Sequence, residues 1–168
     1  MKVLIVNTSD IEGGAARAAY RLHKALLEQD IDSEMLSNSK SSDDYTVTAV
    51  TVSMKMKLFG KFAALRDRLL LKKYPNKTVT LFSSNKYSSG DAVKAINAKK
   101  ADIVHLHWVN HGMLTIEDLL LINAPIVWSL HDMWLFTGGC HYDEGCNKYL
   151  NQCGGCKVLR SSRDNDLS

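Results

Sequence analysis

The sequence contains no apolar run that approaches the ~20 residues needed for a membrane-spanning helix. Its amino-terminal segment, MKVLIVNTSD, carries one lysine and a short apolar run that ends in polar turn-forming residues, so it lacks the apolar core of a secretory signal peptide. These two absences predict a cytoplasmic protein. Because cytoplasmic thiols stay reduced, they also favour metal binding or simple burial over disulfides for clustered cysteines.

An excess of charge of either sign is also missing. The chain has 21 Lys and Arg against 18 Asp and Glu, and a formal net charge of +3 at pH 7. This balance creates no overall field of the kind used by a dedicated nucleic-acid-binding protein, so no nucleic-acid partner is expected. Internal repeats and low-complexity tracts are absent, and 168 residues of 45% apolar content suit one domain over residues 1–168.

What the sequence does contain is an alternation of strand and helix patterns. Residues 2–7 are largely apolar and β-branched, as in a central parallel strand, and a loop with Gly13 and Gly14 leads into residues 15–29, whose apolar side chains recur at helical spacing. Further strands are predicted over residues 33–36, 46–52, 101–107 and 126–130, the last two buried, and further helices over residues 54–74, 89–100 and 115–122. This alternation predicts an α/β Rossmann-like fold: a doubly wound, mostly parallel sheet with helices on both faces.

Three loops should meet at one edge of this sheet. They are the glycine loop after the first strand, the loop that begins at Trp108 after the sequence ADIVHLH, and the loop that begins at His131 after IVWSL. In an open parallel sheet, ligands bind beyond the carboxyl ends of the strands, where such loops diverge and helix N-termini point outward. We therefore expect a ligand site formed by these three loops.

The glycine pair is the first candidate within that site. Gly13 and Gly14 let backbone amides approach a ligand closely, and the helix that follows presents a partial positive charge to a phosphate. The pattern is not GxGxxG, and no acidic ribose partner follows at the usual distance, so dinucleotide binding is not favoured. A tight turn without a ligand is the alternative.

The histidines are the second candidate. His131 directly follows a strand and precedes Asp132, whose carboxylate can orient an imidazole at the edge of the sheet. A hydrogen-bonded histidine that merely ends a strand is the alternative. His105 and His107 share one face of their strand. Burial is the simpler account of His105, whereas His107, beside Trp108 near the strand end, is the better candidate for a ligand contact.

All four cysteines lie in one short stretch with the spacing C-x5-C-x6-C-x2-C, and His141 follows the first of them. They are Cys140, Cys146, Cys153 and Cys156. Zinc takes four tetrahedral thiolate or imidazole ligands, and the final CGGC supplies two on a tight turn, although the first two spacings are unusual for a zinc knuckle. A structural zinc site, reduced buried thiols, and a disulfide or redox pair all remain open.

Residues 54–74 combine an apolar stripe with many basic residues along its borders. Such a helix can lie on an anionic membrane with lysines at the headgroups, which would place the protein at the inner face of the plasma membrane. The alternative is a surface helix that packs its stripe on the sheet.

Four segments together carry a resemblance to a known family. MKVLIVNT followed by GGAARAAYRL, then ADIVHLHW, and then PIVWSLHDMWLFTGGCHY with its trailing cysteines resemble the N-terminal domain of bacterial family 4 glycosyltransferases, the retaining GT-B type, in the branch used for exopolysaccharide, capsule and O-antigen assembly. The likeness spans nearly the whole chain and is most specific in HDMWLFTGGCHY. It implies the acceptor-side half of an enzyme that moves a sugar from a nucleotide-sugar to a glycan or lipid-linked acceptor.

The resemblance also implies roles for individual residues. Gly13 and Gly14 would approach the diphosphate of the donor, and His131 would be the catalytic residue that contacts the transferring sugar. The residues implied on the acceptor side are His107, Trp108, Asp132 and Trp134. Catalysis in the family needs no metal, so any zinc on the cysteines would be structural. The family's C-terminal nucleotide-sugar domain has no counterpart in these residues, so this chain alone is expected to be inactive, and a non-catalytic zinc-containing binding module is the alternative.

Overall fold

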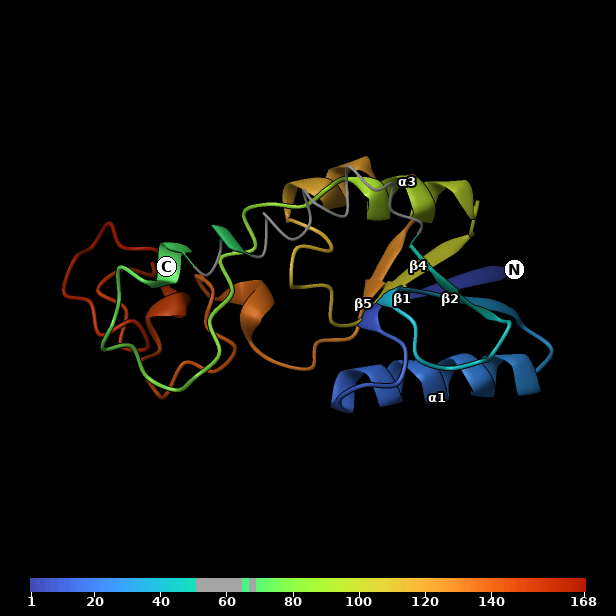
Figure 1. The fold of residues 1–168 in the computed structure, drawn as a ribbon, viewed down its shortest axis with the longest axis horizontal. Helices are drawn as coiled ribbons and strands as arrows, with labels where there is room; N and C mark the ends of the chain where they lie inside the picture. Colours follow the sequence, from blue (N-terminus) through green and yellow to red (C-terminus); the bar gives the residue numbers. More distant parts are fainter. Residues whose placement is uncertain (51–64, 67–68) are drawn as a thin grey trace.

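The computed structural model of the chain describes residues 1–50, 65–66 and 69–168. Five parallel strands form one sheet in the order β3-β2-β1-β4-β5 (Figure 1). The strands are β1 (Lys2–Ser9), β2 (Asp32–Ser39), β3 (Val47–Ala49), β4 (Ile103–Leu106) and β5 (Ile126–Trp128). The chain runs outward from β1 to β3 and then returns to the other side of β1 for β4 and β5. This order confirms the predicted Rossmann-like α/β fold.

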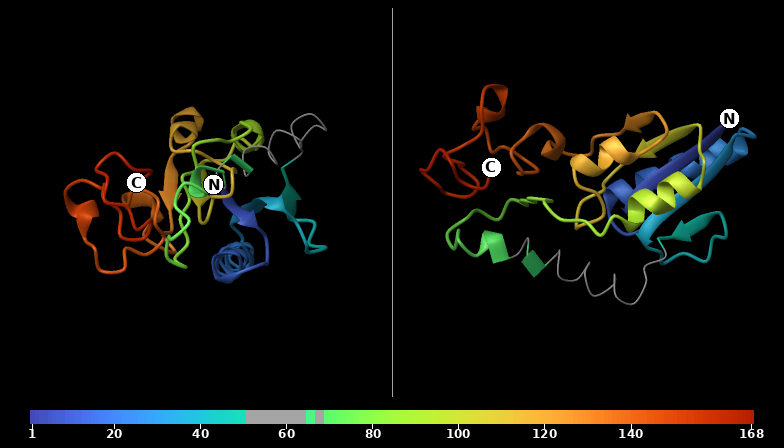
Figure 2. Two further views of the ribbon diagram at one scale, coloured as in Figure 1. Left: turned by 60° about the vertical axis from the view of Figure 1, so that its left-hand side comes forward. Right: turned by 90° about the horizontal axis from the view of Figure 1, so that it is seen from above.

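Helices cover both faces of the sheet (Figures 1 and 2). The helix α1 (Gly14–Glu28) joins β1 to β2 on one face, and α3 (Asp91–Ala98) lies on the other face with the 3-10 helix η1 (Glu117–Leu121). Successive residues of β1 point to opposite faces. Val3 and Ile5 pack in the cluster beneath α1, whereas Leu4 and Val6 pack in the cluster beneath α3. This two-sided burial explains why the first strand is apolar at consecutive positions.

The strand β5 differs from its prediction in length and in burial. It ends at Trp128, and the side chains of Ile126 and Val127 are 37% and 48% exposed. The reason is its position, because β5 is the last strand at one edge of the sheet that the structure describes. An apolar sequence alone does not reveal whether a strand has neighbours on both sides, so the prediction of a buried strand was wrong.

The predicted helix over residues 115–122 is also different in the structure. It forms the short 3-10 helix η1, whose Leu120 is 88% exposed and Leu121 59% exposed. The helix predicted over residues 89–100 is confirmed as α3, and the one predicted over residues 15–29 as α1.

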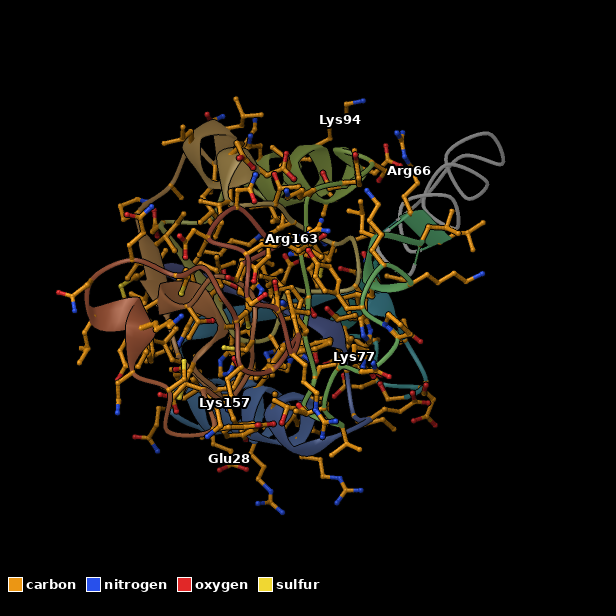
Figure 3. The ribbon with its side chains drawn as sticks, turned by 90° about the vertical axis from the view of Figure 1, so that its left-hand side faces the viewer. Glu28, Arg66, Lys77, Lys94, Lys157 and Arg163 are labelled. Atoms are coloured by element: carbon orange, nitrogen blue, oxygen red, sulfur yellow. The ribbon has the colours of Figure 1, made fainter. Side chains whose placement is uncertain are left out.

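A lobe with little regular structure extends from the sheet and contains the cysteines (left in Figure 1). Its apolar cluster contains Phe82, Cys140, Cys156, Val158 and Leu159. An antiparallel bridge between Phe82 and Cys140 holds two distant segments of the lobe together. Figure 3 faces this lobe and shows the basic side chains Lys77, Lys157 and Arg163 on the side toward the viewer.

Most of residues 54–74 lies outside the described residues. The basic amphipathic helix and the membrane contact predicted there therefore stay predictions. Within the described part of the chain, no helix is long and apolar enough to span a bilayer.

Candidate functional site

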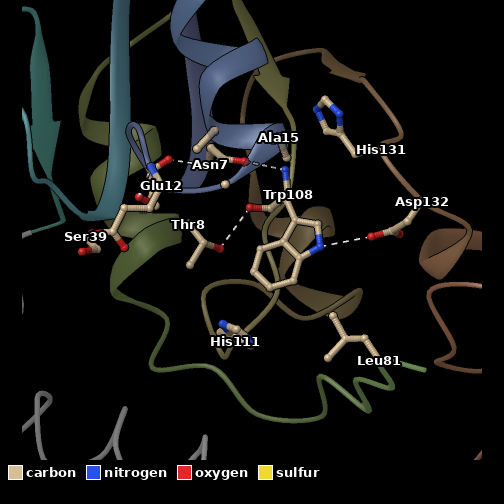
Figure 4. A pocket seen from close by; sticks show the side chains of 14 residues that line it. Asn7, Thr8, Glu12, Ala15, Ser39, Leu81, Trp108, His111, His131 and Asp132 are labelled. Atoms are coloured by element: carbon tan, nitrogen blue, oxygen red, sulfur yellow. Dashed lines mark hydrogen bonds between the residues drawn. The ribbon is translucent and has the colours of Figure 1, made fainter. Parts of the chain in front are cut away.

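A cavity of about 540 Å³ lies at the carboxyl ends of β1, β4 and β5 (Figure 4). The residues that line it include Gly13 and Gly14 from the loop after β1, Trp108 after β4, and His131 and Asp132 after β5. The cavity sits where the chain reverses direction across the sheet between β1 and β4, the place where α/β proteins bind ligands. The predicted meeting of the three loops is confirmed.

The backbone of the glycine loop leaves the start of α1 open to the cavity. Gly13 has a φ of +92°, a conformation that side chains rarely adopt, and it caps α1 without a side-chain hydrogen bond. A Cβ atom built on Gly13 or Gly14 would meet no atom within 4 Å. Because the first amides of a helix have no intrahelical acceptor, those of α1 are available to an anion in the cavity.

Asp10 anchors the same loop from behind. Its carboxylate is buried and accepts hydrogen bonds from the backbone amides of Ser41 and Ser42, both at 2.9 Å, and from that of Ile11 at 3.0 Å. Burial raises the pKa of Asp10, but the hydrogen bonds from Ser42 and Ser41 outweigh it and the net pKa is lowered. The ionised carboxylate therefore ties the loop after β1 to the loop after β2.

Hydrogen bonds between β1 and the loop after β4 hold Trp108 in place. Its backbone amide donates to Oδ1 of Asn7 at 2.8 Å, and its carbonyl accepts from the amide of Thr8 at 2.8 Å and from Oγ1 of Thr8 at 3.0 Å. The ring of His111 meets the indole edge-on, with 4.7 Å between centroids and an angle of 89°. The indole of Trp108 is thus a fixed apolar wall of the cavity (Figure 4).

Asp132 connects the loops that follow β4 and β5. Its Oδ2 accepts from indole Nε1 of Trp108 at 3.1 Å and from Nδ1 of His141 at 2.6 Å, and its Oδ1 accepts from the amide of Trp134 at 2.9 Å. His141 is buried and its Nε2 lies 2.9 Å from Oγ of Ser83. The hydrogen-bonded side chains of Ser83, His141, Asp132 and Trp108 therefore connect the cysteine lobe to the cavity wall.

His131 is exposed at the cavity, and His107 lies behind it. Nδ1 of His107 is 2.9 Å from Nε2 of His131, and the side chain of His107 is only 4% exposed. Burial, together with the neighbouring His105 and His131 as like charges, lowers the pKa of His107 to about 4. His105 lies on the other side of His107, with 4.6 Å between ring centroids, and its Nε2 is 2.8 Å from Oγ of Ser129.

The structure separates the predicted site residues into two groups. Gly13, Gly14, Trp108, His131 and Asp132 line the cavity. His107 and Trp134 do not line it: His107 is behind His131, and buried Trp134 donates from its indole Nε1 to the carbonyl of Ser83 at 2.9 Å. Nδ1 of His107 and Nε1 of Trp134 each face a neighbouring protein group, so these two residues support the walls of the cavity and do not line it.

Several lining residues were missed by the sequence reasoning. They include Asn7, Thr8, Glu12, Ser39, Leu81 and His111. Asn7, Thr8 and Ser39 follow the apolar cores of their strands, so a rule that assigns the polar residues at every strand end to the site would have found them. Leu81 and His111 carry no such signal, since they reach the cavity through irregular segments.

In the described lining of the cavity, the carboxylate side chains are negative, whereas the backbone amides at the start of α1 carry a partial positive charge. Glu12 and Asp132 line the cavity, and no Lys or Arg is among the lining residues that the structure describes. Within the described lining, the groups that can attract an anion are the N-terminus of α1 and hydrogen-bond donors such as the imidazoles of His111 and His131.

The four cysteines are free thiols. Cys140 and Cys156 are buried in the apolar cluster of the lobe, and burial raises the pKa of each thiol more than their hydrogen bonds lower it. The described residues contain no group of three or more His, Cys, Asp or Glu placed to hold a metal ion. The zinc site therefore stays a prediction without structural support, and burial as reduced thiols fits Cys140 and Cys156 better.

Comparison with known proteins gives one relevant relative. The chain is 22% identical over 172 aligned residues to a protein described as a colanic acid biosynthesis glycosyl transferase, WcaC, from Escherichia coli (strain K12). The match covers 96% of this chain and 40% of the relative, so the chain spans less than half the length of that protein. No family model matches the chain, and no solved structure matches it either.

Proposed function

We propose that this chain is the acceptor-side half of a glycosyltransferase that moves a sugar from a nucleotide-sugar to a glycan or lipid-linked acceptor in cell-surface polysaccharide synthesis. Similarity to the colanic acid biosynthesis glycosyl transferase of E. coli over 96% of the chain supports the class of reaction. The observation that carries the proposal is the meeting of the α1 N-terminus, the Trp108 indole and His131 in one cavity at the switch point of the sheet.

Each of these three groups suits one part of the reacting molecules, the nucleotide-sugar or the acceptor. When the glycosidic bond to the diphosphate breaks, negative charge grows on the departing phosphate, and preoriented donors that face it lower the barrier most where water is excluded. The open amides at Gly13 and Gly14 are such donors. The imidazole of His131 lines the same cavity, and we infer that it contacts the sugar next to the phosphate.

Trp108 suits a sugar ring of the acceptor. A sugar ring presents C–H groups on its faces and hydroxyls around its edge, so an aromatic wall with polar neighbours matches both. The indole is that wall, and Asp132 and Glu12 provide carboxylates that accept hydrogen bonds from hydroxyls. We infer that the acceptor-side contacts are made by Trp108 and Asp132, with His107 and Trp134 supporting them from behind.

The finer assignments follow from the resemblance and extend the proposal: a GT-B arrangement, retention at the anomeric carbon, and a nucleotide pocket supplied by a second domain. Such a pocket would also supply the basic side chains that the described lining of this cavity lacks. A second domain closing over the cavity would exclude water, which strengthens the interactions of every donor inside it.

The alternative function is a non-catalytic zinc-containing binding module. The feature that favours it is the set of free thiols in the lobe, but the described residues offer no ready-made metal site.

The proposal is tested by incubating the intact gene product with a panel of uridine and guanosine diphosphate sugars and a mixture of lipid-linked and glycan acceptors. Sugar transfer with one donor supports the enzyme, and analysis of the product's anomeric configuration tests retention. Absence of transfer with every donor, together with stoichiometric bound zinc, would favour the binding module.

A further inference from the structure

The hydrogen bond between His107 and His131 joins a buried imidazole to an exposed one. Nδ1 of His107 and Nε2 of His131 are 2.9 Å apart, and only His131 lines the cavity. Such a bond needs one nitrogen that carries a proton and one that carries a lone pair. The position of that proton decides what His131 can offer to a ligand.

His107 is neutral when the protein is folded near pH 7. Its side chain is 4% exposed, and the titratable groups that face it are His105, with 4.6 Å between ring centroids, and His131, with 5.1 Å. Both would repel a positive charge on His107, in the same direction as burial. A neutral imidazole has a single N–H, on either Nδ1 or Nε2.

The surroundings of Nε2 decide between these two tautomers. Nε2 of His107 is buried and has no hydrogen-bond partner among the residues that the structure describes. A proton there would leave a buried N–H without an acceptor, while the neighbouring Nδ1 could only accept. Orphaned buried N–H groups are rarer in proteins than acceptors with an unused lone pair. The favoured tautomer therefore carries its proton on Nδ1 and directs it to His131.

We propose that His107 is a positioning residue that fixes the tautomer of His131: the Nδ1–H of His107 donates to Nε2 of His131, so His131 carries its own proton on Nδ1. One consequence rests on the proposed function. His131 enters the reaction as a hydrogen-bond donor from Nδ1, and its second nitrogen is occupied. It therefore holds an oxygen of the sugar or phosphate, and it does not act as a general base.

The test is the nitrogen NMR spectrum of the protein with 15N-labelled histidine, recorded above the titration range of its imidazoles. The six histidines give few signals, and single substitutions assign them. The native protein is expected to show His131 with Nδ1 at the shift of a protonated nitrogen and Nε2 at the shift of an unprotonated one, and His107 with its proton on Nδ1. His131 with its proton on Nε2 would overturn the proposal, and this native spectrum decides without any variant.

Two matched variants then separate the bond from general packing. His107→Phe keeps a ring but removes the donor, so the two nitrogens of His131 are expected to shift toward the intermediate values of a tautomer mixture. His105→Phe changes the neighbour on the other side and leaves the bond intact, so His131 keeps its native shifts. An unchanged His131 in a folded His107→Phe protein would count against the proposal. Because no substrate is used, a failure of sugar transfer in the intact gene product would refute the proposed function and leave this result standing.

Discussion

Indole Nε1 of Trp108 and Oδ2 of Asp132 are joined by a hydrogen bond of 3.1 Å across the cavity wall. The same oxygen accepts from Nδ1 of buried His141 at 2.6 Å. One carboxylate thus holds together the loop after β4, the loop after β5 and the cysteine lobe. The wall against which a ligand packs depends on this carboxylate as much as on the indole.

The first prediction is that Asp132→Ala destabilises the protein. The substitution leaves the Nδ1–H of His141 buried without its acceptor and removes the partner of the Trp108 indole, so we expect a loss of ~1–3 kcal/mol in the free energy of unfolding. Urea titration followed by circular dichroism measures it. The matched control is Asp43→Ala, because Asp43 is exposed and outside the cavity. Equal midpoints for the two variants would contradict the account of the wall.

The second prediction concerns the two glycines before α1. Gly13→Ala forces a side chain into a φ of +92° and should cost ~1–3 kcal/mol of stability. Gly14→Ala meets open space at an ordinary φ and adds a better helix former, so it should be neutral or stabilising by up to ~1 kcal/mol. Thermal unfolding of both variants checks this difference. Two equally destabilised variants would mean that the loop conformation described above is not the one in solution.

The third prediction is a loss of stability in mild acid caused by His107. Burial and the neighbouring imidazoles of His105 and His131 lower the pKa of His107 from 6.5 to about 4, so between these values the unfolded chain binds a proton that the folded protein does not. The contribution of neutral His107 to the free energy of unfolding is therefore fully present above pH 6.5. It decreases as the pH drops toward 4, by ~2–4 kcal/mol in total. His107→Phe should flatten this slope. Urea titrations at half-unit steps between pH 4 and pH 7 provide the measurement, and parallel slopes in the two proteins would refute the assignment.

The fourth prediction concerns the thiols. Cys140 and Cys156 are buried, whereas Cys146 and Cys153 are partly exposed, so an alkylating reagent should modify Cys146 and Cys153 first. Mass spectrometry of the protein after short exposures to iodoacetamide gives the order, and zinc is quantified in the same sample. If all four cysteines resist alkylation until a chelator is added, with one zinc per chain, the tetrathiolate site proposed from the spacing is correct and burial is not the cause.

The long, regular elements of this fold are the ones that the sequence predicts well. The apolar residues of β1 and the helical spacing in α1 are local patterns, and each reflects a local cause: two covered faces for β1 and one covered face for α1. The exposure of Ile126 and Val127 depends on whether another strand lies beside β5, which is a property of the whole sheet. A local pattern contains no information about it.

The candidate site was predictable in its location and not in its internal contacts. Strand ends of a parallel sheet share one edge, so the positions of Gly13, Trp108 and His131 follow from the order of strands and loops. The contacts that shape the site join residues far apart in sequence, such as Asn7 with Trp108 and Ser83 with His141, which are 101 and 58 positions apart. No periodicity relates such pairs, and so the burial of His107 behind His131 was not foreseen.

The most direct test of the central claim is the rate of sugar transfer by the intact gene product carrying His131→Ala, compared with Tyr45→Ala. Tyr45 is 91% exposed and does not line the cavity, so its loss should leave the rate unchanged. Loss of one preoriented donor at a reacting group typically lowers kcat by about 100-fold or more, and that is the result expected for His131→Ala. A His131→Ala enzyme that transfers sugar as fast as the Tyr45→Ala control would show that the chemistry does not take place in this cavity.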